Sequence, residues 1–498
     1  MKLPNIALLV LSTFLFLLFI SPAALAQGKL FTVDDIGDSN DVAVGDRICA
    51  DSNGKCTLRE AIQEANSDVY MDGINFALPL PSTVDLTLGE LVITSSVYIA
   101  GPGARNLTVQ RSFAAGTPQF RIFRVQYPGN PIPTTIRGLT IKNGVGTGDG
   151  GAIYSENQST LQIFDVTITG NTAGGSAGAI FSAGTLTLTR SLISLNTANG
   201  LFAGGVVNIG HFTNSIISDS TITNNSGGQG GAIYNTGTLF LINDTITHNS
   251  ARDAASSVIN TTLGTMNVMN TIIGMDNSPA VSSLSGIFVS LGNNIITDAR
   301  NSTGFTNGIN NDQVSDNNAI DPLLGDPANN GGQTDTRALL NGSPAIDHGN
   351  SCVSNGNCAQ PVPQSFRLTT DQRSRYFRLV GANVDIGAFE LQSQPSSGGS
   401  LGFGALTFNN RAGGALVTLT NARTNEKQVN VTNPFGNFVF NGLALGDVYF
   451  LEMKPKRQNQ RAGLTVFDFD TLPMLVPALS DPGQWQIKVF PVKKDPSR

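Results

Sequence analysis

The stretch GAIYSENQSTLQIFDVTITGNTAGGSAGAIFSAGTLTLTRSLISLN, residues 151–196, contains one pattern twice. Its opening Gly-Ala-Ile-Tyr returns as Gly-Ala-Ile-Phe at 178–181, and related segments begin at Gly205 and Gly231, so the glycines are 27, 27 and 26 residues apart. Two further short elements lie in the repeat, such as Leu-Thr-Leu-Thr at 186–189 and Thr-Ile-Thr at 167–169. Each repeat therefore holds three short strands of period two, separated by turns rich in Gly and Asn.

Three strands in about 26 residues are typical of one rung of a parallel β-helix, in which rungs stack at about 4.8 Å around a narrow apolar core. A leucine-rich repeat of this length needs a Leu-x-x-Leu-x-Leu frame, which is absent, and a propeller blade needs about 40 residues. We therefore predict an all-β protein whose main part, residues 101–310, is a right-handed parallel β-helix with three strands per rung. The pattern leaves the rung register open between residues 67 and 135.

The stacked rungs predict columns of equivalent side chains. One column is an amide ladder in which each side chain bonds its neighbours above and below, and it comprises Asn171, Asn196, Asn225 and Asn249. Six residues earlier in the rungs lie Asp165, Arg190, Asp219 and Asn243. The favoured interpretation of this second column is a surface charge ladder of exposed pairs, each contributing about 0–1 kcal/mol. The alternative is a lyase or hydrolase centre.

A short helix is expected before the first rungs. Thr57 and Glu60 form a capping box, and one apolar face follows at helical spacing, made by Leu58, Ala61, Ile62 and Ala65. Such a helix fits a plug over the open end of the solenoid, where it protects the first edge strands. A helix that binds a partner is the alternative. Residues 27–100 are thus expected to form an N-terminal cap and the first rungs.

Residues 1–26 have the character of a signal peptide, with Lys2, a 15-residue weakly polar to apolar run and a final Ala-Leu-Ala. We expect export, a mature chain without a membrane span, and a secreted or cell-surface location. Charged residues are only 13% of the chain and the net charge is −6, with no Lys/Arg cluster, so nucleic acid is not an expected partner.

The four cysteines fall into two local pairs, Cys49 with Cys56 and Cys352 with Cys358. Both pairs close short polar loops in a chain expected to be exported, where disulfides persist. We predict two disulfides. A metal site is the less favoured alternative, because the spacing is wider than in zinc knuckles and His348 alone lies nearby.

The repeat decays after residue 280. Residues 311–390 are dense in turns and are expected to close the solenoid, and 391–400 read as a flexible Ser/Gly linker. Residues 401–498 contain short alternating segments that predict a β-sandwich.

Three segments resemble bacterial modules. Residues 56–66, CTLREAIQEAN, resemble the CSLREA motif, with Thr57 in place of its serine, and the Gly-Gly-Ala-Ile-Tyr rungs resemble polymorphic outer-membrane-protein-type β-helices. Residues 321–390 are similar to the choice-of-anchor Q domain, and residues 401–498 resemble a carboxypeptidase-regulatory-like domain, most closely at Thr-Asn-Pro-Phe-Gly, 432–436. The resemblance implies a secreted or surface-displayed bacterial protein and brings no catalytic residues.

Because β-helices also host pectin-degrading enzymes, the polar residues need a separate assessment. Residues 150–250 carry four acidic residues and one basic residue, without the paired carboxylates that sugar hydrolysis needs. The densest polar group comprises Asp347, His348, Asp371, Arg373, Asp385 and Glu390. We interpret it as turn-forming residues that satisfy backbone groups where the solenoid closes; binding of calcium or action on a sugar is the alternative. His211 and His248 are expected at ordinary turn or face positions.

We assign no catalytic, cofactor-binding or metal-binding residue, and no cofactor. The leading hypothesis is a non-catalytic structural or adhesive scaffold whose β-helix face binds polysaccharide or a cell-surface partner. The rival hypothesis is a polysaccharide lyase or glycoside hydrolase. It would use either the face near Asp165, Arg190 and Asp219 or the later acidic group.

Overall fold

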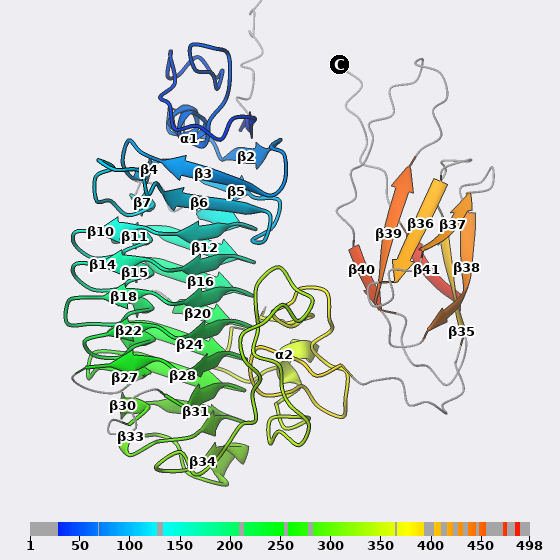
Figure 1. Ribbon diagram of the computed structural model, residues 1–498. Coiled ribbons are helices and arrows are strands. Elements are labelled where there is room, and N and C mark those ends of the chain that lie inside the picture. Colours follow the sequence, from blue (N-terminus) through cyan, green and yellow to red (C-terminus); the bar gives the residue numbers. More distant parts are fainter. Residues whose placement is uncertain are drawn as a thin grey trace, which may run out of the picture.

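The computed structural model describes residues 28–392, apart from 68, 127–132, 209–213, 253–256, 277–281 and 364–365, and beyond residue 402 only strands. The expected signal peptide and most of the expected linker lie outside the described residues. From residue 30 to 314 the chain winds into a right-handed parallel β-helix, coloured blue to green in Figure 1. The predicted fold class is therefore confirmed.

One rung illustrates the others. After β11 (Ile153–Ser155) the chain forms β12 (Thr160–Phe164), β13 (Thr167–Thr169) and the two-residue strand β14 (Thr172–Ala173), before the next rung begins. Each strand pairs in parallel with its equivalent in the next rung, so that the strands build four stacked sheets, here called A, B, C and D. The three predicted strands per rung are present, and sheet D adds a fourth, very short one.

Sheet A contains, in stacking order, β1 (Leu30–Val33), β2 (Asp72–Phe76), β5 (Val97–Ala100), β8 (Thr134–Arg137), β12, β16 (Thr185–Thr189), β20 (Asn214–Ser218), β24 (Thr238–Ile242), β28 (Thr265–Met269) and β31 (Val289–Gly292). Sheet B contains β3 (Ser82–Leu86), β6 (Leu107–Arg111), β9 (Thr140–Lys142), β13, β17 (Leu192–Ser194), β21 (Thr221–Thr223), β25 (Thr245–Thr247), β29 (Ile272–Gly274), β32 (Ile295–Ile296) and β34 (Gln313–Val314).

Sheet C contains β4 (Leu91–Ile93), β7 (Phe123–Val125), β11, β15 (Ile180–Ser182), β19 (Val206–Asn208), β23 (Ile233–Asn235), β27 (Val258–Asn260), β30 (Leu284–Ile287) and β33 (Asn301–Thr303). Sheet D contains β10 (Val145–Gly146), β14, β18 (Thr197–Ala198), β22 (Ser226–Gly227) and β26 (Ser250–Ala251).

Alternate side chains of the strands fill the interior. In the rung of β11 these are Ile153, Leu161, Ile163 and Ile168, all fully buried in one continuous core. Burial of each such side chain contributes about 1.5–3 kcal/mol. The corner before sheet C is tight: a Cβ on Gly178 would lie 2.5 Å from the backbone nitrogen of Thr197 in the next rung. Glycine recurs in the repeat because only it fits there.

The predicted asparagine ladder is present. The Nδ2 of Asn171 donates to Oδ1 of Asn196 at 2.9 Å, Asn196 donates to Asn225 at 3.0 Å, and Asn225 donates to Asn249 at 3.1 Å. Each Oδ1 also accepts a backbone N–H from the preceding rung. The ladder thus satisfies polar groups in a buried corner, where an unpaired group is costly.

The N-terminal cap also follows the prediction. Helix α1 (Leu58–Ala65) begins after Thr57, whose backbone N–H donates to Glu60 at 2.8 Å and whose hydroxyl accepts from the Glu60 N–H, which completes the capping box. Leu58, Ala61, Ile62 and Ala65 are buried in the solenoid core. Figure 1 shows α1 over the first strands. Because most of its residues are buried, the helix itself offers little surface to a partner.

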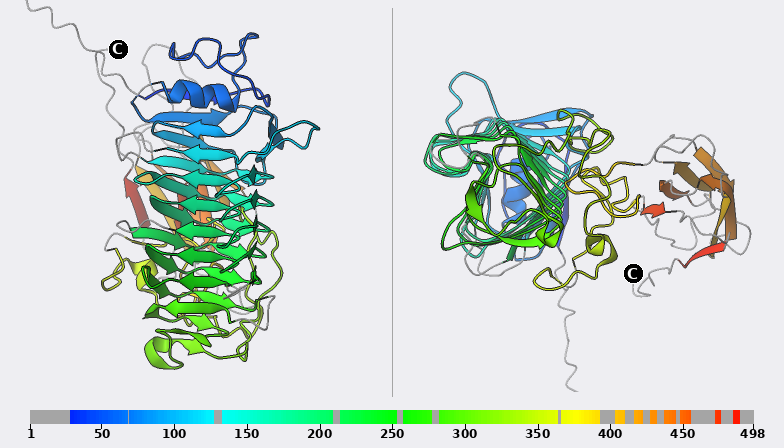
Figure 2. Two further views of the ribbon diagram at one scale, coloured as in Figure 1. Left: turned by 90° about the vertical axis from the view of Figure 1, so that its left-hand side faces the viewer. Right: turned by 90° about the horizontal axis from the view of Figure 1, so that it is seen from below.

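Residues 321–390, here called the side segment, lie along the outside of the solenoid and not across its end (Figure 2). The segment begins after the 3₁₀ helix η1 (Ile309–Asn311) and β34, and it contains α2 (Cys352–Asn355). Its Val353, Val362 and Leu368 pack on the outer face of sheet A, and its Leu339, Ile386 and Phe389 belong to a cluster on the outer face of sheet B. The side segment therefore covers the corner between sheets A and B.

Both predicted disulfides are present, Cys49–Cys56 in the cap and Cys352–Cys358 in the side segment. Beyond residue 402 the described strands form two sheets. One contains β38 (Asn437–Ala444), β35 (Phe403–Asn409) and β41 (Gln484–Lys488). The other contains β37 (Lys427–Val431), β36 (Leu416–Asn421), β39 (Val448–Lys454) and β40 (Leu472–Leu475).

Candidate functional site

The second predicted column runs along the corner between sheets A and B. Its members Asp165, Arg190, Asp219 and Asn243 each follow the last residue of a sheet A strand and have φ values of 55, 51, 46 and 58°. Aspartate and asparagine tolerate this left-handed conformation better than most residues, which explains their recurrence at the corner.

The upper part of this column is a charge ladder, as expected, but its carboxylate is buried: the side chain of Asp165 is only 4% exposed. The guanidinium of Arg190 donates to both oxygens of Asp165 at 2.9 and 3.0 Å, and Arg137 lies 3.3 Å from the same carboxylate. A carboxylate held by two arginines is a stable structural element.

The expectation of an exposed ladder is wrong for Asp219. The side segment covers it, so that only 1% of the side chain is exposed, and its partner is Arg378, at 3.5 Å and fully buried. Among the described residues, neither oxygen of Asp219 has a hydrogen-bond partner, and Nε and Nη1 of Arg378 have none either. Burial raises the pKa of Asp219 to about 7, although the positive charge of Arg378 opposes the shift.

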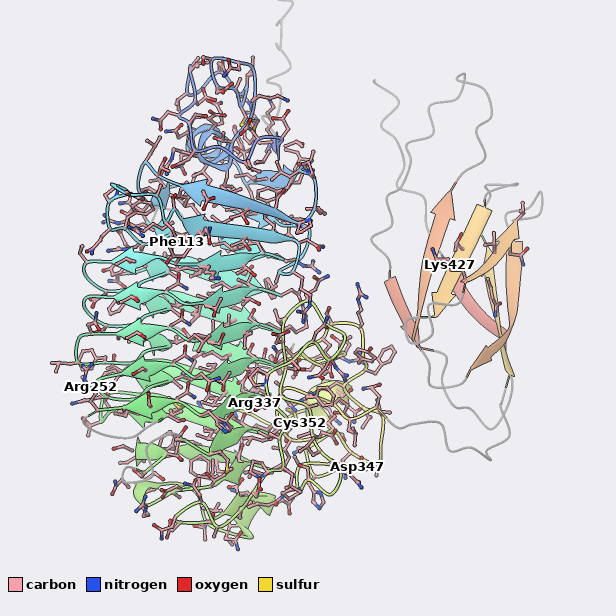
Figure 3. The ribbon with its side chains drawn as sticks, in the orientation of Figure 1. Phe113, Arg252, Arg337, Asp347, Cys352 and Lys427 are labelled. Carbon is pink, nitrogen blue, oxygen red and sulfur yellow. A yellow bond between two sulfur atoms is a disulfide. The ribbon has the colours of Figure 1, made fainter. Side chains whose placement is uncertain are left out.

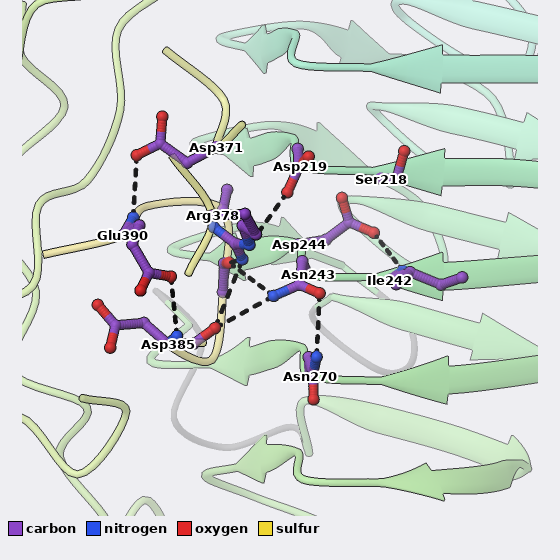
Figure 4. A network of polar contacts seen from close by, with 12 residues as sticks. Ser218, Asp219, Ile242, Asn243, Asp244, Asn270, Asp371, Arg378, Asp385 and Glu390 are labelled. Carbon is purple, nitrogen blue, oxygen red and sulfur yellow. Dashed lines mark hydrogen bonds and ion pairs between the residues drawn. The ribbon is translucent and has the colours of Figure 1, made fainter. Parts of the chain in front are cut away.

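Three residues of the later polar group, Asp371, Asp385 and Glu390, lie near this ion pair (Figure 4). Asp371 holds Arg373 at 2.8 and 2.5 Å and accepts the N–H of Glu390 at 3.0 Å, and Asp385 accepts the N–H of Asp347 at 2.7 Å. The carboxylate of Glu390 accepts the N–H of Asp385 at 2.9 Å. These contacts satisfy backbone groups, as the sequence predicts for turn-forming residues. They do so against the side of the solenoid, however, and not at its end.

Sequence analysis missed the part played by Asp244. Its carboxylate accepts the N–H groups of Ser220 and Ile242 at 2.9 and 3.0 Å, within an inner column of the A–B corner. The column comprises Ser191, Ser220, Asp244, Thr271, Asn294 and Asp312. Burial raises the pKa of Asp244 well above its ordinary value. The repeated polar residue before each sheet B strand from β17 onward was the signal for this column.

The rival enzyme hypothesis requires accessible carboxylates, but Asp165, Asp219 and Asp371 are paired or buried. Asp165 is held by two arginines, and Asp219 and Asp371 are 1% and 0% exposed. Within the described ranges no three His, Cys, Asp or Glu side chains are grouped so that they could hold a metal ion. His348 shares a hydrogen bond with the carbonyl of Ile346, and His211 lies outside the described residues.

The outer face of sheet C presents a different kind of surface. Register places Tyr154, Phe181, Val207, Tyr234 and Ile259 in one outward row, one residue per rung. The rings of Tyr154 and Phe181 stack with centroids 5.2 Å apart, and Phe202 from a corner loop stacks on Tyr234 at 4.1 Å.

Phe181 and Val207 are buried in this outer cluster, whereas Tyr154, Phe202 and Tyr234 remain partly exposed. We use the name sheet C aromatic row for Tyr154, Phe181, Val207 and Tyr234 of the register row together with Phe202, which stacks on it. The side segment packs on sheets A and B and leaves the row uncovered. The fourth position of the Gly-Ala-Ile-Tyr motif was the sequence signal for it.

Comparison with known proteins gives one informative similarity. The chain is 31% identical over 130 residues to "Probable autotransporter YfaL" of Escherichia coli (strain K12). The match covers 25% of this chain and 9% of that much longer protein. No protein-family model and no solved structure matches the chain. In the part of the chain that the structure describes, no helix has the length and apolar character needed to cross a membrane.

Proposed function

We propose that this chain is a secreted or cell-surface scaffold that binds polysaccharide and has no catalytic centre of its own. Export is supported by the signal-peptide character of residues 1–26. Display outside the cell is supported by the β-helix and by the similarity of 130 residues to a probable autotransporter. The resemblance of residues 56–66 and 321–390 to modules of secreted bacterial proteins points in the same direction.

The sheet C aromatic row is the observation that supports polysaccharide as the ligand class. Its two partly exposed tyrosines, Tyr154 and Tyr234, occupy equivalent positions three rungs apart, about 14 Å at the rung spacing of about 4.8 Å, so they offer similar contacts to a ligand that is itself a repeat. Tyr154 and Tyr234 combine an apolar ring edge with a hydroxyl, which suits a ligand with both C–H faces and hydroxyls. Single contacts of this kind are weak, and a polymer gains affinity by making many of them at once.

The test is retardation of the mature chain, residues 27–498, during electrophoresis through gels that contain neutral or acidic polysaccharides. Replacing both exposed tyrosines, Tyr154→Ala with Tyr234→Ala, is expected to weaken retardation about tenfold, equivalent to about 1.4 kcal/mol. The variant Tyr154→Phe with Tyr234→Phe keeps the stacked rings and removes only the hydroxyls. Weaker retardation of this variant would therefore indicate a hydroxyl contact with the ligand and not a loss of structure. Phe113→Ala is the matched control, because Phe113 is 71% exposed, lies on the upper rungs between β6 and β7 (Figure 3) and is not a member of the row.

Equal retardation of the alanine variant and the wild type would place the ligand on another face. Release of unsaturated or reducing sugars would contradict a non-catalytic scaffold. Binding to cells without retention by any polysaccharide would identify a surface protein as the partner.

A further inference from the structure

The contact between the side segment and the solenoid contains an unusual concentration of buried acid. Asp219 and Asp244 lie on the solenoid side, and Asp371, Asp385 and Glu390 lie on the side segment, each at most 2% exposed. The buried cations that face them are Arg373 and Arg378, 4% and 0% exposed. If every group were ionised, five carboxylates would face two guanidinium groups in a region without solvent.

Such an excess of buried charge is unstable, because charges in a low-dielectric contact must be paired or neutralised. Arg373 does not neutralise the charge of Asp219, because its guanidinium is bound to Asp371. That guanidinium also lies between the rings of Tyr376 and Phe389, at 3.9 and 3.8 Å from their centroids. Asp219 is left with Arg378 at 3.5 Å, and within the described residues it receives no hydrogen bond.

The charged groups around Asp219 come from both sides of the contact, whereas those around Glu390 and Asp385 belong to the side segment. Asp219 faces Arg190 and Asp244 on its own column and rungs, and Arg378 and Asp371 on the side segment. Glu390 faces Arg378, Asp385 and Asp371, all within the side segment. Asp385 also faces Asp347 and Arg378. Repulsion across the contact therefore acts between Asp219 and Asp371, and repulsion within the docked side segment acts on Glu390.

We propose that protons control the attachment of the side segment: it stays docked while Asp219 and Glu390 carry protons, and it detaches from sheets A and B when they ionise. Detachment uncovers two apolar patches on the solenoid. One comprises Phe240, Ile242 and Met269 on sheet A, and the other comprises Ile272 and Ile295 on sheet B. The solenoid core lies inside the sheets and is not part of this contact.

The direction follows from proton linkage. Burial raises the pKa of Asp219 to about 7 and that of Glu390 well above its ordinary value, so the docked state binds these protons more tightly than a detached, solvated state. The protons therefore favour docking fully below the ordinary carboxyl range, and this contribution is lost as the pH rises through about 7. As the pH rises from the ordinary carboxyl range to the docked-state pKa, each such proton weakens docking about tenfold per pH unit. Above the docked-state pKa both states have released the proton, and docking weakens no further.

Hydrogen exchange of the mature chain, followed by mass spectrometry between about pH 5 and about pH 9 and corrected for intrinsic exchange, tests the proposal. Peptides from the second half of the side segment are expected to lose protection about tenfold or more per pH unit up to about pH 7, where Asp219 has released its proton. Peptides from the asparagine ladder serve as an internal reference and should keep theirs. Asp219→Asn and Glu390→Gln are each expected to reduce this pH dependence, because the neutral amides cannot ionise.

Asp165→Asn is the matched control, since Asp165 occupies the same column and backbone conformation but pairs with Arg137 and Arg190 of the solenoid and not with the side segment. It should leave the pH dependence of the side segment unchanged. Constant protection in the wild type across the pH range would overturn the proposal. Loss of side-segment protection at every pH in Asp219→Asn and Glu390→Gln would also overturn it. That result would mean that ionised carboxylates hold the segment on the solenoid. A shift of the midpoint by calcium chloride or EDTA would assign the neutralising charge to a metal ion instead of a proton.

Discussion

Asp219 and Arg378 meet across 3.5 Å in a contact that solvent does not reach, one from a corner of the solenoid and the other from the segment that runs back along it. The pair joins two parts of the fold that are distant in sequence. It also shows that the corner column changes character along its length. It is a solvent-accessible ladder near Arg137 and a buried contact from Asp219 onward.

Replacement of Arg378 is expected to destabilise the side segment in a pH-dependent way. Arg378→Met removes the cation and leaves buried carboxylates uncompensated, which costs up to about 3–5 kcal/mol where they begin to ionise, near about pH 7. Near about pH 5 the loss should be smaller, because the carboxyl groups with raised pKa are then neutral. Urea-dependent pulse proteolysis of the side segment measures both values.

Arg105→Met supplies the comparison for Arg378. Arg105 pairs with Asp335 of the same segment at 2.6 Å, but both side chains are about one-third exposed. Its loss should cost at most about 1 kcal/mol at either pH. Equal costs for Arg378→Met at the two pH values would show that the buried acids do not titrate in this range.

Removal of one asparagine from the ladder is expected to leave polar groups unpaired in the neighbouring rungs as well. Asn196→Ala removes the acceptor for the N–H and Nδ2 of Asn171 and the donor to Asn225 and to the carbonyl of Ile168. Because the groups left behind are buried, we expect a loss of about 2–4 kcal/mol in the free energy of unfolding. Asn199→Ala, an exposed position three residues later, should change it by less than about 0.5 kcal/mol. Similar effects of the two variants would mean that the ladder adds no stability.

A substitution at Leu195, the residue directly before Asn196 of the ladder, is expected to stabilise the protein. Leu195 has a φ of 57° and is 62% exposed, and the equivalent residues in neighbouring rungs include Gly170 and Asn224. Leu195→Asn relieves the left-handed strain without loss of a core contact, so we expect a gain of about 0.5–1 kcal/mol in unfolding free energy. A thermal melt that falls or stays constant would show that Leu195 contributes through its exposed side chain.

Sequence analysis was most informative where the repeat itself imposes the structure. The asparagine ladder and the rung strands could be predicted because residues at equal positions in successive repeats must stack. The capping box at Thr57 was equally local, since its two bonds lie within one turn. The two-residue strands of sheet D were missed because so short an element carries no period-two pattern.

The side segment shows where this reasoning fails. It has no repeat, so nothing in its sequence indicates which rungs it contacts. The bond of Thr221 to Gln372 at 2.6 Å joins residues about 150 positions apart. The exposure of Asp219 therefore could not be derived from its column, and the identity of its partner depended on tertiary packing. Both Asp219 and Asp165 are buried, and the ion-pair partner distinguishes them: Asp165 pairs with Arg190 of the solenoid, and Asp219 with Arg378 of the side segment.

The path of the side segment has a mechanical consequence for the solenoid. A stack in which each rung contacts only its neighbours tends to fray from its ends, one rung at a time. The side segment bonds to Arg105, to the carbonyl of Arg190, to Asn243 and to Asn293, which lie on rungs far apart along the stack. Opening a rung under load therefore requires breaking bonds at several other levels as well. The segment thereby makes a repetitive, one-dimensional structure unfold more nearly as a single cooperative unit.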